Sequence, residues 1–269
     1  MGVSENSYAL ITGASKGLGK ALAIELARRK FNVLLAALPN EGLSFLCKHI
    51  KDEYAVDAAF FETDLTKKEG LLKISQWVKD NYNVSILINN AGFGGTMPFD
   101  CTSIDYLDNM VNLNVKAPVL LTHQLLPILK NHECSYILNV SSMFSCSPIG
   151  YKTIYPATKS FLYYFSRGLA EELKENKVTV CVVHPGPMKT NVDVRKRISC
   201  HGFFGRLGLL RVEEVARIAI SKMFRGKHVI VPGFVNYFNW LLLNVFPNSI
   251  KAPLLSKNVK REIHTEANT

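Results

Sequence analysis

The chain has 269 residues, of which 48% are hydrophobic, and a formal net charge of +10. The length suits one large α/β domain with a buried core, and no internal repeat, low-complexity tract or long linker divides it, so we predict a single domain over residues 1–269. The charge does not indicate a nucleic-acid partner, because the basic residues are dispersed and lack the aromatic interleaving of an RNA-binding surface.

Short apolar runs alternate along the chain with helical patterns, as expected for a parallel sheet with helices on both faces. The runs lie near residues 8–11, 31–37, 57–61, 84–88, 136–140, 178–183 and 228–231. We therefore predict a Rossmann-like, doubly wound α/β fold.

A glycine-rich turn follows the first apolar run. Residues 12–19 read Thr-Gly-Ala-Ser-Lys-Gly-Leu-Gly, and a helical apolar pattern begins directly after them. Strand, glycine turn and helix in this order predict a dinucleotide site, because glycine permits close backbone approach and the helix N-terminus offers N–H groups to a pyrophosphate. A tight strand-to-helix turn without a ligand is the alternative.

Polar residues follow two of the central runs at their carboxyl ends. Asn89-Asn90-Ala91-Gly92 follows the run at 84–88, and Ser141-Ser142 follows the run at 136–140. Ligands of open α/β sheets bind beyond such ends, so the Ser142 hydroxyl is expected to point into the cleft. The alternative is that Ser142 caps a helix or forms a turn.

Tyr155 and Lys159 are four positions apart, which places both on one face of a helix. A nearby ammonium stabilises a phenolate and lowers the pKa of a tyrosine, which can then exchange a proton with a carbonyl or alcohol oxygen. Tyrosine and lysine at this spacing also occur on solvated helix faces, and that is the alternative interpretation.

The glycine turn, the segment at 89–92, Ser142 and the Tyr155/Lys159 pair occur in the order found in the short-chain dehydrogenase/reductase family. The chain resembles this family over roughly residues 7–235. Ser142 precedes Tyr155 by the family's thirteen positions, and Asn114 stands where the family has its catalytic asparagine. The resemblance implies that Tyr155 donates the proton and Ser142 binds the substrate oxygen. It also implies that Lys159 binds the nicotinamide ribose and that Asn114 holds a water connecting Lys159 to solvent. A helix-kinking or capping amide is the alternative for Asn114.

The same resemblance implies a cofactor site formed by the glycine turn, an acidic turn that meets the adenine, the segment after residue 88 and a loop that cups the nicotinamide. The expected contacts are Gly13, Ser15, Lys16, Gly17, Leu18, Gly19, Asp64, Leu65, Asn90, Ala91, Gly92, Tyr155, Lys159, Pro185, Gly186 and Thr190.

The choice of nicotinamide cofactor is predicted from residues 33–40, at the end of the second apolar run. An acid for the ribose hydroxyls of NAD is expected there, and none appears before Glu41. By resemblance, NADP-dependent members often have an arginine where Leu38 stands, whereas Lys16 matches a basic position that meets the 2′-phosphate. We favour NADP(H), with NAD(H) as the alternative, and the positive charge of the chain can attract a phosphorylated cofactor or an anionic acyl substrate.

The resemblance implies an NAD(P)(H)-dependent oxidoreductase that interconverts a carbonyl and a secondary alcohol by hydride transfer. A nucleotide-binding sensor or scaffold without turnover is an alternative from another class, although all four reactive residues are present. A lipid-binding module built on the C-terminal segment is a third interpretation.

Two apolar segments bear on the substrate and on partners. Residues 191–210 match the family's variable substrate lid, and their apolar side chains favour a hydrophobic or acyl-type substrate. Residues 234–246 begin an apolar and basic extension over 234–269 and are too few to span a bilayer. We consider three roles for them, in this order: a helix that packs on a partner, a wall of the substrate pocket, and an interfacial membrane helix assisted by the basic tail at 251–261.

The cysteines are too dispersed for a zinc motif, so we predict reduced thiols and no metal site. Residues 1–7 show no signal peptide, and Asn6 stands where a myristoylation signal needs Ser or Thr, so the predicted location is the cytoplasm. Family members usually form dimers or tetramers, so the resemblance implies a homo-oligomer, and peripheral membrane contact is not favoured.

Overall fold

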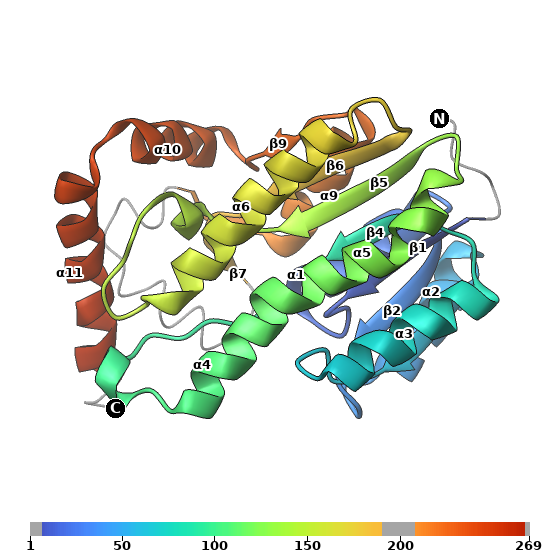
Figure 1. The fold of residues 1–269 in the computed structure, drawn as a ribbon, viewed down its shortest axis with the longest axis horizontal. Helices are drawn as coiled ribbons and strands as arrows, with labels where there is room; N and C mark the ends of the chain where they lie inside the picture. Colours follow the sequence, from blue (N-terminus) through green and yellow to red (C-terminus); the bar gives the residue numbers. More distant parts are fainter. Residues whose placement is uncertain (1–6, 190–207, 267–269) are drawn as a thin grey trace.

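The fold is built on one sheet of seven parallel strands (Figure 1). The structure is a computed structural model, and it describes residues 7–189 and 208–266. The strand order is β3-β2-β1-β4-β5-β6-β9. Every predicted apolar run is a strand of this sheet, which confirms the Rossmann-like fold. The bounds are β1 Tyr8–Thr12, β2 Asn32–Ala37, β3 Ala58–Glu62, β4 Val84–Asn89, β5 Ser135–Val140, β6 Val178–Val183 and β9 Val229–Ile230.

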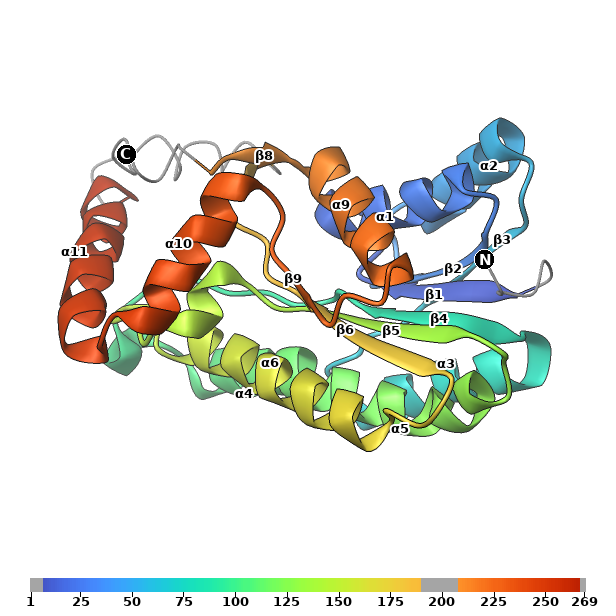
Figure 2. The same ribbon diagram turned by 90° about the horizontal axis from the view of Figure 1, so that it is seen from above.

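Helices cover both faces of the sheet, which explains why the strands read as continuous apolar runs (Figure 2). One core layer joins the sheet to α1 (Gly17–Arg28), α2 (Leu43–Tyr54) and α9 (Val212–Phe224). The other joins it to α3 (Lys68–Asn81), α5 (Ala117–Lys130) and α6 (Ile154–Glu172), and the short α4 (Ile104–Val111) precedes α5 on that side.

The strand order reverses at β1, which pairs with β2 on one side and with β4 on the other. The chain leaves the carboxyl end of β1 toward α1 on one face of the sheet, and it leaves the carboxyl end of β4 toward α4 and α5 on the other face. A crevice therefore opens beyond the carboxyl ends of β1 and β4, where open α/β sheets bind their ligands.

Two C-terminal helices, α10 (Phe234–Val245) and α11 (Asn248–Glu266), stand beyond the carboxyl ends of the strands (Figures 1 and 2). The remaining elements are short: η1 Phe99–Cys101, η2 Asn112–Lys116, η3 Met143–Cys146, β7 Met188–Lys189 and β8 Leu210–Arg211. No helix in the described ranges is both long and apolar enough to cross a bilayer. The single-domain organisation of residues 1–269 stays a prediction, because residues 190–207 are outside the described part.

Candidate active site

The turn between β1 and α1 has the backbone geometry of an anion cradle. Gly13 and Gly17 have φ angles of +64° and +56°, which favour glycine. A Cβ added to Gly19 would lie 2.1 Å from the carbonyl oxygen of Gly13, so the turn and the helix pack too closely for any side chain there. The first turn of α1 has no side-chain cap and no acidic residue, which leaves its N–H groups to a ligand. These features fit the pyrophosphate of a dinucleotide.

Side-chain hydrogen bonds fasten this turn to the end of β4. The buried Thr12 Oγ1 accepts from the backbone N–H groups of Asn90 and Ala91, each at 3.0 Å. In return, Asn90 Nδ2 donates to the carbonyl oxygens of Thr12 at 2.9 Å and Gly13 at 3.1 Å. Asn90 and Ala91 therefore brace the glycine turn. The sequence does not indicate this role of Thr12, since its partners follow a strand more than seventy residues away.

Asn114 lies on η2, a single π-helical turn inserted between α4 and α5. π-turns inside helices frequently mark functional sites. Its Nδ2 donates to the Phe93 carbonyl oxygen at 2.8 Å and to Thr158 Oγ1 at 3.1 Å, and its Oδ1 accepts from the Phe93 N–H at 3.1 Å. A Cβ on Gly92 would come within 2.8 Å of that Oδ1 and 3.1 Å of Lys159 Nζ. Asn114 thus sits at a helix distortion and also holds the loop beside Lys159; its water-binding role stays a prediction.

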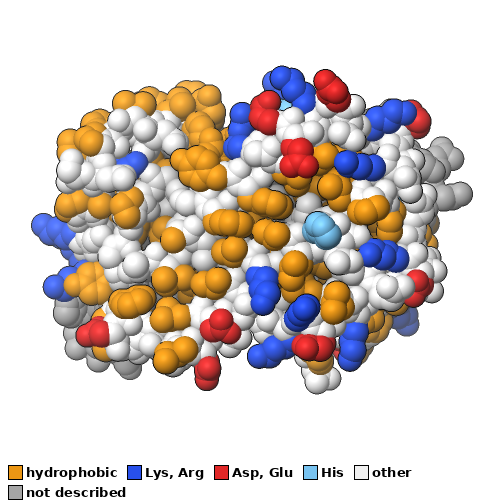
Figure 3. All heavy atoms as spheres, viewed as in Figure 1, with side chains coloured by type: hydrophobic (Ala, Val, Ile, Leu, Met, Phe, Trp, Pro, Cys, Tyr) orange, Lys and Arg blue, Asp and Glu red, His pale blue; other side chains and the backbone are white. Residues whose placement is uncertain are grey.

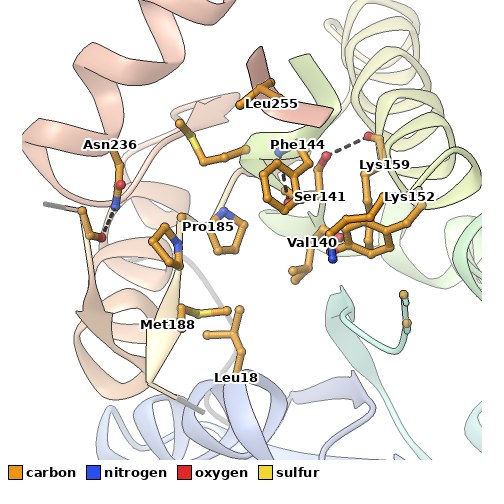
Figure 4. Close-up of a pocket in the computed structure, with 18 of the residues that line it drawn as sticks. Leu18, Val140, Ser141, Phe144, Lys152, Lys159, Pro185, Met188, Asn236 and Leu255 are labelled. Carbon is orange, nitrogen blue, oxygen red and sulfur yellow. Dashed lines mark hydrogen bonds between the residues drawn. The ribbon is translucent and has the colours of Figure 1, made fainter. Parts of the chain in front are cut away.

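Tyr155 and Lys159 both project from α6 toward the carboxyl end of β5. Lys159 Nζ donates to the Val140 carbonyl oxygen at 2.9 Å and lies 5.9 Å from the centroid of the Tyr155 ring. Ser141 Oγ donates to the Lys159 carbonyl oxygen at 2.7 Å, which fixes the helix against β5 (Figure 4). Lys159 is therefore buried and Tyr155 half-buried in a cleft wall, and the pair does not belong to a solvated helix face.

The electrostatics of this pair differ from the expectation. Burial lowers the pKa of Lys159 to about 8, because desolvation disfavours its ammonium form. Burial raises the pKa of the Tyr155 phenol, and a hydrogen bond with the Ser142 hydroxyl acts in the opposite direction. The predicted lowering of the Tyr155 pKa by Lys159 is thus wrong for this state of the cleft, since the sequence could not show that both groups lose water.

Ser142 combines the two roles considered for it. Its hydroxyl accepts from the Phe144 N–H at 3.2 Å at the start of η3, and the residue also lines the cavity beside Tyr155. His184, directly before Pro185, supports this segment: its Nδ1 lies 3.1 Å from the Ser142 carbonyl oxygen and 3.0 Å from Ser145 Oγ. Burial lowers the pKa of His184 to about 4, so its ring is neutral. Nothing in the sequence indicated His184.

A cavity of about 630 Å³ brings many of the predicted residues together (Figure 4). Its lining includes Leu18, Asn90, Gly92, Ser142, Tyr155, Lys159, Pro185 and Gly186. Asn239 and Leu243 from α10 and Leu255, Asn258 and Val259 from α11 complete the wall. Part of α10 is therefore a pocket wall, the second of the three roles considered for residues 234–246.

Several predicted cofactor contacts lie away from this cavity. Asp64 Oδ1 accepts from the N–H and hydroxyl of Thr66 at 2.9 and 2.7 Å, and Leu65 is buried beneath that turn. Both follow β3 at the carboxyl edge of the sheet and do not line the cavity. Thr190 and most of the predicted lid at 191–210 are outside the described residues.

An acid reaches the glycine turn from an unexpected position. Glu41 Oε1 lies 2.8 Å from Lys16 Nζ, and Ser15 Oγ donates to Glu41 Oε2. These contacts with Lys16 and Ser15 hold the pKa of the Glu41 carboxyl below its usual value. Two predicted cofactor contacts, Ser15 and Lys16, are thus bound by the Glu41 carboxylate.

The comparisons with known proteins agree with this geometry. A family model described as short chain dehydrogenase matches residues 7–199. The chain is 27% identical to a solved short-chain dehydrogenase from Sphingobium yanoikuyae in complex with NADPH, with a TM-score of 0.78 over 88% of this chain and 92% of that one.

Curated relatives carry names of two kinds. The chain is 33% identical over 231 residues to "Hydroxysteroid dehydrogenase-like protein 1" of Gallus gallus, covering 84% of this chain and 68% of that protein. The human protein called "Inactive hydroxysteroid dehydrogenase-like protein 1" is 30% identical over 260 residues, 93% of this chain and 78% of that one. "Very-long-chain 3-oxoacyl-CoA reductase-B" of Danio rerio is 31% identical over 198 residues, 72% of this chain. The match spans only 63% of that reductase's length.

Gly19→Ala tests the close packing of the glycine turn. The added Cβ would collide with the Gly13 carbonyl oxygen, so we expect a loss of about 1–3 kcal/mol in the free energy of unfolding and weaker nucleotide binding. Gly168→Ala, also in a helix but with no atom near the added Cβ, is the matched control and should stabilise the protein by about 0.5–1 kcal/mol. Urea denaturation of both variants checks this, and equal effects would contradict it.

Lys159→Met tests the buried ammonium through pH. Below pH 8 Lys159 is charged in both the folded and the unfolded protein, and its burial cost is fully present. Between pH 8 and 10.5 the folded protein releases this proton first, so the unfolded state binds more protons and wild-type stability rises relative to the variant. We expect a relative gain of about 3 kcal/mol across this window in urea denaturation. A difference that does not change with pH would show that Lys159 is not desolvated.

Proposed function

Because the chain belongs to the short-chain dehydrogenase family, we propose that it is an NADP(H)-preferring oxidoreductase that interconverts a carbonyl and a secondary alcohol. The observation that carries this proposal is the shared cavity of Ser142, Tyr155 and Lys159, which opens beside Leu18 of the glycine turn. A hydroxyl, a phenol and an ammonium around one space are the groups that proton exchange with a substrate oxygen needs.

In the proposed reaction, a bound nicotinamide supplies or accepts the hydride. Tyr155 gives its phenolic proton to the carbonyl oxygen, and Ser142 donates a hydrogen bond to the same oxygen as negative charge develops on it. Lys159 keeps a positive charge behind the phenol near neutral pH, which stabilises the phenolate that remains. Because burial keeps Tyr155 protonated, this arrangement favours carbonyl reduction at neutral pH and alcohol oxidation at higher pH.

We propose a hydrophobic or acyl-type substrate. The cavity is lined by apolar side chains from several elements, among them Phe144, Met188, Leu243, Leu255 and Val259. The Danio rerio relative is named for very-long-chain 3-oxoacyl-CoA, and the similarity to it supports an acyl chain carrying a 3-oxo group.

The alternative is a nucleotide-binding sensor of the same fold without turnover. One observation favours it: the human relative, which is 30% identical over 93% of this chain, is named inactive. Retention of the full reactive set favours the enzyme, since a sensor has no chemical need for Ser142, Tyr155 and Lys159 in one cavity. The predictions of a cytoplasmic location and a homo-oligomer remain to be tested.

Tyr155→Phe separates these two functions. The change removes the proton donor and leaves the ring, so we expect NADPH binding to persist while turnover of a 3-oxoacyl thioester falls at least 100-fold. Absorbance of NADPH gives the rate and its fluorescence gives the Kd. Tyr164→Phe, an exposed tyrosine on the same helix, should change neither. Nucleotide binding by the wild-type protein without turnover of any carbonyl substrate would favour the sensor.

Lys16 and Glu41 test the cofactor preference. We expect Lys16→Gln to raise the Kd for NADPH by roughly fivefold, as for loss of an exposed ion pair, and to leave the Kd for NADH unchanged. Glu41→Gln should lower the Kd for NADPH, because it frees Lys16 and removes a like charge from the phosphate site. Fluorescence titration with both nucleotides measures each effect. Equal losses for NADPH and NADH in Lys16→Gln would contradict a 2′-phosphate at this residue.

A further inference from the structure

Helix α10 buries one polar side chain against the protein and exposes most of its apolar ones, unlike an ordinary surface helix. Asn236 is 2% exposed, and its Nδ2 donates to the carbonyl oxygens of Gly208 at 2.8 Å and Pro232 at 3.0 Å. Asn239 lines the cavity, and Asn244 Nδ2 lies 3.6 Å from Cys146 Sγ. Asn236 thus attaches the start of this helix to the loops beside it, whereas Asn244 near its end is exposed.

The outward side of α10 is apolar. Phe234 and Val245, at its two ends, are 86% and 80% exposed, and Phe238 between them is more than half exposed. We use the name outer apolar face for the exposed hydrophobic side chains of α10 and the start of α11: Phe234, Val235, Tyr237, Phe238, Leu241, Leu242, Val245, Phe246, Ile250 and Leu254. In the space-filling view, hydrophobic side chains gather at the upper left, over α10 (Figure 3). A contiguous exposed surface of this kind marks an interaction site.

The charged residues nearest the outer apolar face in the sequence are basic. No charged residue occurs from Val229 to Ile250, the four from 251 to 261 are Lys251, Lys257, Lys260 and Arg261, and the acids Glu262 and Glu266 come only at the end of α11. Lys257 and Lys260 are exposed, and basic side chains lie at the left edge of the molecule over α11 (Figure 3). Apolar side chains followed by a basic segment over residues 251–261 match an anionic lipid surface, where each basic residue adds attraction.

A second copy of the chain matches the same face less well. A symmetric dimer would place this face against itself and bring the two basic segments at 251–261 close to each other. Anionic headgroups would instead neutralise these charges. No helix in the described ranges can cross the bilayer, so contact would be at its surface.

We propose that α10 and α11 dock on an anionic membrane, with the outer apolar face inserted at the boundary between headgroups and acyl chains. The inner sides of the same two helices line the cavity, through Leu243 of α10 and Leu255 of α11. Docking therefore brings the cavity wall to about one helix diameter, roughly 10 Å, from the lipid. The proposal rests on the exposed side chains and their charges, and it does not require the proposed catalysis.

Vesicle flotation of the full chain tests the proposal. We expect binding to vesicles of phosphatidylcholine with 30% phosphatidylserine, weak binding to phosphatidylcholine alone, and a decrease with salt. Phe234→Glu combined with Val245→Glu should weaken binding more than tenfold, because both side chains insert in the docked state. Both are highly exposed, so the fold should tolerate the changes.

The matched control is Phe45→Glu combined with Ile104→Glu. These two side chains are 81% and 83% exposed and lie on α2 and α4, away from the outer apolar face, so binding should not change. Lys257→Gln combined with Lys260→Gln should remove the preference for phosphatidylserine. Absence of binding by the wild-type chain, or equal binding by the Phe234/Val245 variant, would overturn the proposal. A lipid-free dimer that becomes a monomer in that variant, measured by ultracentrifugation, would assign the face to a second copy instead.

Discussion

The candidate site depends on the bridge between β1 and β4. These neighbouring strands lie at the reversal of strand order, where the chain leaves the sheet in two directions and the backbone would otherwise be free to separate. The Thr12 hydroxyl and the Asn90 amide close this gap with four hydrogen bonds to backbone groups. Since Thr12 is buried and the other groups are partly shielded from water, an unmade bond here would cost free energy. The glycine turn is therefore held in its cradle shape before any ligand arrives.

The loss of water from polar groups also determines the properties of the other side of the crevice. Within residues 7–189 and 208–266, the buried Lys159 ammonium has one hydrogen-bond acceptor, the Val140 carbonyl oxygen, and no carboxylate partner. Desolvation then lowers the pKa of Lys159, and it raises the pKa of the neighbouring half-buried Tyr155 phenol, which retains its proton more firmly. A tyrosine in this state is a proton donor. In the proposed reaction, the electrostatics of the cleft would therefore favour proton donation by Tyr155, and a positively charged ligand ring would shift the balance toward the phenolate.

Much of the fold and of the candidate site could be predicted because its signals are local. Strands buried on both faces must be apolar throughout, and glycine positions with positive φ must lack side chains, so both features are written in short segments. The features of the site that were not predicted are contacts between segments distant in the sequence. Glu41 reaches Lys16 across a turn, His184 supports Ser142 from the next strand, and Thr12 joins residues after β4. The sign of the Tyr155 pKa shift failed for the same reason, since burial is a property of the whole fold.

Helix α10 shows why residues 234–246 left several roles open. An apolar segment in a sequence is normally assigned to the core, and this helix does close the cavity with Leu243. Yet its only deeply buried residue is Asn236, whose amide is satisfied by two carbonyl oxygens of the loops beside it. Polar attachment on the inside leaves most of the apolar side chains outside, where water makes them unfavourable. A helix built in this way serves two surfaces at once: the inner one shapes the cavity, and the outer one requires a partner that is itself apolar.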